Sequence, residues 1–123
     1  MLYYKNKKPP RHFCSGDRLL SVLHARLRNH CSTLQSDLFN ANLVQDANCL
    51  CGFINEDAKH YLLYCNNFSS QRLLMINEIN VFAVNITIEL LLSGDESLSS
   101  EENDSVFLSV QKYIKSTKRF SQL

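Results

Sequence analysis

The sequence predicts a mainly α-helical fold, a small domain of about five to six helices. Only three Gly and two Pro occur among the 123 residues, and this composition favours helices over a turn-rich β-sheet protein. Hydrophobic residues make up 45% of the chain and charged residues 20%, which is ordinary for a globular domain with its own core. Apolar residues also recur at helical spacing in several segments.

Two regions are expected at the N-terminal side. Residues 1–14 are predicted to be a basic arm, extended or disordered, because Pro9-Pro10 interrupts regular structure. Residues 15–94 are predicted to be the helical domain, and its first helix follows the capping sequence Ser15-Gly16-Asp17. Four leucines of this helix fall on one stripe: Leu19, Leu20, Leu23 and Leu27.

Two shorter helices are expected in the middle of the domain. Ser32 is the predicted cap of the first of them. A loop then leads to Asn55, the predicted cap of another helix at about 56–65. The acidic pair Glu56-Asp57 supports this start, because negative charge is favourable at the N-terminal end of a helix dipole.

The remaining helices lie in the C-terminal half. Ser69 is expected to open a longer helix, and residues 86–92 fit either a strand or a helix, of which we favour a short helix. Residues 95–103 are predicted to be an acidic linker, and residues 104–123 a C-terminal helix that packs back on the domain. Its apolar face would consist of Val106, Phe107, Val110, Tyr113 and Ile114.

The segment 49–65 contains a candidate metal site. Its potential ligands follow the pattern C-x-C, eight residues, H, four residues, C, and they are Cys49, Cys51, His60 and Cys65. Three thiolates with one imidazole are a structural zinc set, and they favour Zn²⁺ over Mg²⁺ or Ca²⁺. The sequence therefore predicts a structural Zn²⁺ that ties a loop to a helix. The alternative is that these cysteines are small buried hydrophobic residues.

The spacing demands two local distortions. Two cysteines one residue apart point to opposite faces of an extended chain, so Gly52 is expected to bend the chain beside them. His60 and Cys65 are five residues apart, which is about 140° around an α-helix. We therefore expect the helix to end at Cys65, before Asn66.

No group of residues indicates catalysis. Cys65 and His60 could in principle be a nucleophile and its base, but no feature of the sequence marks an activated thiolate. The predicted zinc site has four protein ligands and leaves no position for a reacting water. We expect a protein that is not an enzyme.

Charge is segregated along the chain. Residues 1–30 and residues 111–123 are strongly basic, whereas residues 31–110 hold eleven of the twelve acidic residues. Such asymmetry is typical of an end that faces nucleic acid, and the alternative is a pair of solvated tails. The candidate nucleic-acid contacts are Lys5, Lys7, Lys8, Arg11, Arg18, His24, Arg26 and Arg28. For His24, the alternative is packing beside the leucines of its helix.

About residues 18–120 resemble the C-terminal, post-polymerase tail of reverse transcriptases from non-LTR retrotransposons, which is similar to a zinc knuckle. The matching features begin with a helix that carries His and Arg and continue with Leu-Phe and Leu-Val pairs. A Cys-x-Cys-Gly segment, an acidic pair, a His-x₄-Cys segment and an Arg follow. In this chain they are His24, Arg26, Leu27, Leu38, Phe39, Leu43, Val44, Cys49, Cys51, Gly52, Glu56, Asp57, His60, Leu63, Cys65 and Arg72.

The resemblance implies a zinc-stabilised fragment that binds the RNA or target DNA of such an element. The polymerase and endonuclease of the parent family have no counterpart here, so we expect a detached tail without catalysis. Two alternatives stay open. One is a module for protein interaction, with a polymerase domain or by self-association, through the apolar residues of 81–92. The other is a truncated relic with no function of its own.

The location is expected to be intracellular, nuclear or cytoplasmic, and not secreted. The first residues, MLYYKNKKPPRH, include basic residues but no apolar run follows them, so they do not form a signal peptide. No window holds the roughly 18 apolar residues that a membrane span needs.

Overall fold

The computed structural model describes residues 18–120, and all regular structure in this range is helical. This confirms the predicted fold class. The elements are α2 (Arg18–Arg28), α3 (Gln35–Asn40), the π-helical turn η1 (His60–Tyr64), the 3-10 turn η2 (Asn66–Phe68), α4 (Ser69–Ile79), α5 (Ile88–Ser93) and α6 (Ser100–Thr117). None of these helices combines the length and apolar character that a bilayer span requires.

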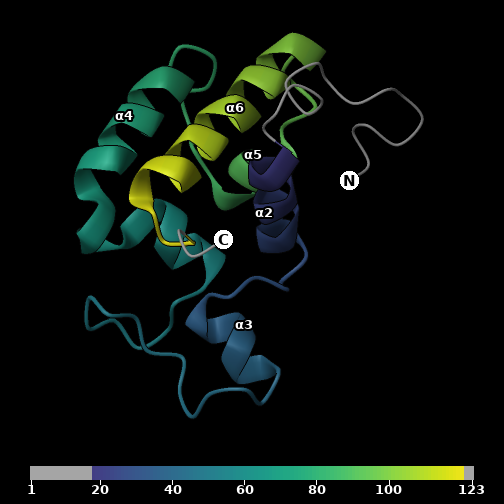
Figure 1. Cartoon of the computed structure of the whole chain (residues 1–123). Helices are drawn as coiled ribbons and strands as arrows, with labels where there is room; N and C mark the ends of the chain where they lie inside the picture. Colours follow the sequence, from purple (N-terminus) through teal and green to yellow (C-terminus); the bar gives the residue numbers. More distant parts are fainter. Residues whose placement is uncertain (1–17, 121–123) are drawn as a thin grey trace.

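The longest helix, α6, organises a bundle (Figure 1). Helices α4, α2 and α5 all pack against it, and α2 also contacts α5. Leu20 and Ile114 line one groove near the C-terminal end of α6, whereas His24 contacts Phe107, which is nearer the N-terminal end of α6. Helix α2 therefore runs antiparallel to α6. Helix α3 and the long loop that follows it lie apart from this bundle, at the bottom of Figure 1.

The core of the bundle is formed mainly by the apolar stripe of α6. All five residues predicted for this stripe are buried, which confirms the predicted apolar face. In α2 the buried residues are Leu23, His24 and Leu27, while Leu19 is 50% exposed. The buried face of α2 therefore differs from the predicted one. It includes His24, which was not predicted to be part of the apolar stripe, and it does not include Leu19.

Helix α6 begins at Ser100, earlier than the start predicted near residue 104. Ser99 and Glu102 form a capping box, in which the Ser99 hydroxyl accepts the Glu102 N–H and the Glu102 carboxylate accepts the Ser99 N–H. Acidic side chains in the first turn also suit the helix dipole. The acidic run that we interpreted as a linker is thus partly the start of the helix.

The ambiguous segment near residue 90 is a helix. In α5, the Thr87 hydroxyl accepts the Leu90 N–H as an N-cap, and Gly94 ends the helix with a φ of +84°. Leucines 90 to 92 are buried in the core, so they are unavailable for the self-association predicted for residues 81–92. Within that segment, Val81 and Val84 are strongly exposed.

Candidate metal centre

A tight turn positions the first two candidate ligands. The Gly52 N–H donates to the Cys49 carbonyl over 3.0 Å, and the Cys49 N–H donates to the Phe53 carbonyl over 2.8 Å. Gly52 has a φ of +103°, a conformation that glycine adopts without the steric cost that a Cβ imposes. The prediction that Gly52 bends the chain beside Cys51 is therefore confirmed.

A π-helical turn positions the other two candidate ligands. The Cys65 N–H donates to the His60 carbonyl over 2.8 Å, which is the i→i+5 bond of a π-helix. This wider turn brings residues five apart closer to one face than an α-helix would. Cys65 then takes an extended conformation, with φ −64° and ψ 123°. The predicted helix end is confirmed, but the π-turn was not expected.

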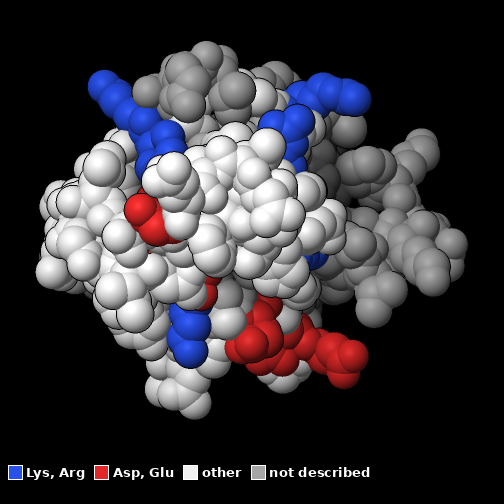
Figure 2. All heavy atoms as spheres, turned by 90° about the horizontal axis from the view of Figure 1, so that it is seen from below, with Lys and Arg blue, Asp and Glu red and all other residues white. Residues whose placement is uncertain are grey.

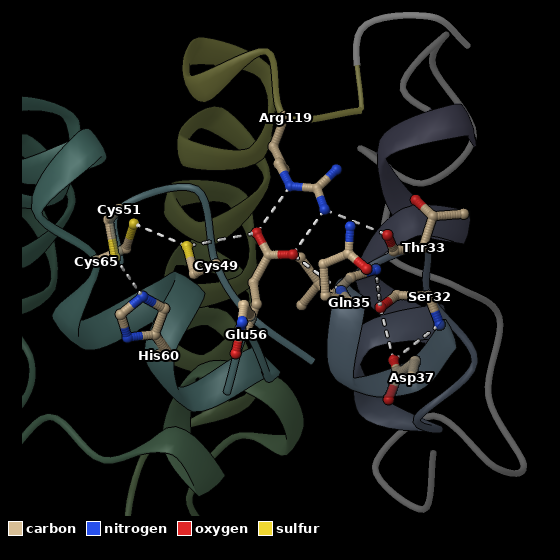
Figure 3. Close-up of polar contacts among 12 residues, drawn as sticks. Ser32, Thr33, Gln35, Asp37, Cys49, Cys51, Glu56, His60, Cys65 and Arg119 are labelled. Carbon is tan, nitrogen blue, oxygen red and sulfur yellow. Dashed lines mark hydrogen bonds and ion pairs between the residues drawn. The ribbon is translucent and has the colours of Figure 1, made fainter. Parts of the chain in front are cut away.

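The four candidate ligand atoms converge. All of them lie within 4.8 Å of one another. Cys49 Sγ lies 3.7 Å from Cys65 Sγ, and Cys51 Sγ lies 3.2 Å from His60 Nε2 (Figure 3). Two sulfur ligands of a tetrahedral zinc with Zn–S near 2.3 Å would be about 3.8 Å apart. The cluster can therefore hold a metal ion.

The electrostatics of the cluster differ between its two sides. Cys49 and Cys65 are buried, and burial raises the pKa of Cys49 to about 12 and also raises the pKa of Cys65. Cys51 is less buried, and its hydrogen bond with the Phe53 backbone lowers its pKa. Burial lowers the pKa of His60, which favours the neutral, ligating imidazole. Buried thiolates need a nearby cation, which a bound metal would supply.

A buried carboxylate connects the cluster to distant parts of the chain. Glu56 is 3% exposed, and its Oε2 lies 3.8 Å from Cys49 Sγ. Arg119 holds this carboxylate with two hydrogen bonds, Nε to Oε2 at 2.9 Å and Nη2 to Oε1 at 2.7 Å. The Gln35 N–H donates to Glu56 Oε1 over 2.9 Å. Glu56 therefore joins the loop of residues 41–57, called the metal loop below, to α3 and to the chain after α6 (Figure 3).

The capping role predicted around residue 56 falls on one residue alone. Asp57 Oδ1 accepts the His60 N–H over 2.8 Å, and the Asn55 side chain donates to Asp57. Asn55 is thus not the cap, and Glu56 does not act on the helix dipole as we predicted. Tertiary contacts with Arg119 take the Glu56 side chain instead.

Arg72 holds the end of the π-turn. Its side chain is buried and donates to the carbonyls of Leu62 and Cys65, at 3.1 Å and 2.6 Å. It also donates to the Tyr113 hydroxyl, at 3.3 Å. These bonds satisfy carbonyls that a helix C-terminus leaves without partners. Reasoning from the sequence missed this role, and the only signal was an Arg within the family resemblance.

The predicted nucleic-acid contacts are scattered. Lys5, Lys7, Lys8 and Arg11 lie outside the described residues. Arg18 and Arg26 are exposed on α2, and Arg28 donates to the Leu92 carbonyl. His24 is 1% exposed, and its Nε2 lies 2.8 Å from the Leu91 carbonyl oxygen. His24 is therefore part of the core, which favours the packing alternative over a contact with nucleic acid.

The face that lies at the bottom of Figure 1 is mostly uncharged (Figure 2). Lys and Arg side chains lie at separate points around this face, and Asp and Glu side chains gather at one edge of it. The α3 side of the molecule therefore has no continuous basic patch among the described residues.

Comparison with known proteins identifies no relative. No protein-family model, curated protein or solved structure matches this chain.

Proposed function

We propose that Cys49, Cys51, His60 and Cys65 bind a structural Zn²⁺ and that the chain binds RNA or DNA without catalysing a reaction. The convergence of these four ligand atoms within 4.8 Å is the observation that carries the proposal. The resemblance to the tail of retrotransposon reverse transcriptases supports the nucleic-acid part, because that tail acts beside a polymerase on RNA or DNA.

Zinc fits the donor set better than other biological cations. Three thiolates and one imidazole are soft and borderline donors, and they form a closed tetrahedral set. When bound, the ion would supply a cross-link and charge neutralisation rather than a reactive water. Arg72 and Glu56 then orient the ligands. Arg72 donates to the Cys65 carbonyl at the end of the π-turn, and the Glu56 carboxylate contacts the Cys49 thiol.

The packing of α2 on α6 supports binding of a polyanion by the two basic ends of the chain. Lys115 and Lys118 lie with Leu19 and Leu20 around one groove, at the start of α2. The described part of the chain begins at that same end, with Arg18. Phosphate contacts from both ends of the sequence could therefore act together, although they are far apart along the chain.

A salt titration tests the nucleic-acid proposal. Binding of the zinc-loaded chain to single-stranded and duplex RNA and DNA is measured by fluorescence polarisation over a range of KCl concentrations. We expect affinity to fall steeply with salt, with a slope of about −0.7 to −0.9 per phosphate contact. Replacing Arg18 and Lys115 by Gln lowers the slope, and replacing the exposed Lys59 by Gln is the matched control. Absence of binding at low salt contradicts the proposal.

Self-association is a second candidate function, because Val81 and Val84 are 78% and 93% exposed. Sedimentation of the chain at several concentrations distinguishes the two candidates. Association through apolar residues persists or strengthens at high salt, and Val84→Asp would abolish it. Binding to nucleic acid has the opposite salt dependence.

A further inference from the structure

One side of the metal cluster opens into a pocket. This pocket has a volume of about 500 Å³, which lies in the range of small-molecule sites. Six residues line it: Cys51, Gly52, Phe53, His60, Tyr64 and Asn66. Lys115 and Lys118 line a different groove, and nothing in the proposed zinc or phosphate contacts uses the two aromatic rings of this pocket.

The aromatic rings of the pocket are unusually accessible. Phe53 is 50% exposed and Tyr64 is 60% exposed, while the aromatic residues of α6, Phe107 and Tyr113, are buried. Phe53 stacks on His60 with ring centroids 4.6 Å apart and an interplanar angle of 10°. Because His60 belongs to the ligand cluster, this stack holds the plane of Phe53 in place at the mouth of the pocket.

The pocket also has polar groups next to these rings. His60 is 5% exposed, and its Nε2 faces Cys51 Sγ at 3.2 Å. The other ring nitrogen, Nδ1, points away from the sulfurs (Figure 3) and has no hydrogen-bond partner among residues 18–120. Metal-ligating histidines usually donate this second N–H to an acceptor. The side-chain amide of Asn66, which can donate and accept, lies in the same lining.

From this geometry we propose that the pocket binds one unpaired base of single-stranded RNA or DNA. This inference rests on the proposed function and assigns its base-contacting site. A planar heteroaromatic ring fits a site with flat aromatic surfaces and a few edge-directed donors and acceptors. A base inside a duplex is stacked on both faces and cannot enter, so the pocket would add a preference for single strands to the phosphate contacts.

The test uses the zinc-loaded full chain and a single strand of about ten nucleotides with one 2-aminopurine. The emission of 2-aminopurine changes when it stacks, whereas phosphate contacts alone leave it unchanged. We expect the wild-type chain to bind the single strand, to change this emission and to prefer the strand to its duplex. Phe53→Leu should weaken binding about 10-fold and remove the emission change. Phe39→Leu is the matched control, because Phe39 is 45% exposed but lies outside the pocket.

A second variant guards against damage to the cluster. Tyr64→Ala removes the ring that does not stack on His60, so zinc content should stay at the wild-type value while binding weakens by about the same factor. If Phe53→Leu and Tyr64→Ala keep both affinity and emission change, the base pocket is wrong and the phosphate contacts alone explain binding. If no strand binds at low salt, the proposed function and the pocket both fail. If Phe53→Leu instead dissolves a dimer seen in sedimentation, the pocket's occupant is a second copy of the chain, and the proposal is overturned.

Discussion

The two regions of this protein are held together by different forces. In the bundle of α2, α4, α5 and α6, large apolar side chains such as Phe107 and Leu91 are fully buried. In the metal loop, residues 41–57, the large apolar side chains point outward, and Leu43, Leu50 and Ile54 are 70%, 96% and 76% exposed. The loop has Cys49 and Glu56 as its buried residues. Burial of apolar area can stabilise the bundle, whereas the loop depends on polar cross-links and on the metal ion that we propose it binds.

This comparison predicts that a core substitution has the largest effect on stability. Phe107→Ala should lower the free energy of unfolding by about 3–5 kcal/mol, because it removes a fully buried ring from α6. Leu50→Ala, in the loop, should change it by less than about 0.5 kcal/mol. Denaturant titration monitored by circular dichroism measures both. A large loss in Leu50→Ala would mean that the loop has an apolar core of its own.

The link between the two regions should have the next largest effect. Arg119→Gln leaves the buried Glu56 carboxylate without its bidentate partner, which we expect to cost about 3 kcal/mol. The double variant Glu56→Gln/Arg119→Gln should recover part of this loss, because no unpaired charge is left. Denaturant titrations of these two variants and of the single variant Glu56→Gln form the cycle. A loss in the double variant equal to the sum of the losses in the two single variants would show that Arg119 acts independently of Glu56.

A smaller effect is expected inside the metal loop. Gly52→Ala has room for its Cβ, since no atom lies within 4 Å of it, but the φ of +103° is strained for any L-residue. The strain should be about 1–3 kcal/mol and should weaken metal affinity while the bundle stays folded. Competition with a zinc-sensitive dye measures the affinity, and Leu50→Ala is the control. Unchanged affinity would mean that the turn is not needed for ligation.

The smallest effect concerns an exposed ion pair of the bundle. Lys112 Nζ lies 3.0 Å from Glu78 Oε2, and the hydrogen bonds from Lys112 and Ser109 lower the pKa of Glu78. A carboxylate whose pKa is lowered in the folded state adds stability at pH values above its ordinary, unfolded-state pKa. This stability is lost as the pH falls through the lowered pKa. Lys112→Ala should therefore destabilise by less than about 1 kcal/mol near pH 7. The difference should vanish in acid, and a difference that persists there contradicts the assignment.

The same contrast explains which features could be predicted from the sequence. The apolar face of α6 was predictable because its core contacts repeat with the helical period, and the ligand set was predictable because Cys and His at close spacing limit the options. Two contacts were not predictable: the one between Arg72 and the Cys65 carbonyl, and the one between Arg119 and Glu56. They join residues 7 and 63 positions apart and depend on how the helices pack. The start of α6 was predictable in principle, since Ser99 and Glu102 have the spacing of a capping box.

Metal content tests the central claim most directly. The chain and its Cys49→Ser/Cys51→Ser variant are purified without added chelator and analysed by elemental mass spectrometry, and amide hydrogen exchange is followed in both. The account predicts one zinc per wild-type chain and none in the variant. It also predicts that exchange in the variant rises in residues 41–65 while α6 stays protected. The account would be contradicted by a wild-type chain that is folded, holds no zinc and shows the same amide exchange in residues 41–65 as the variant.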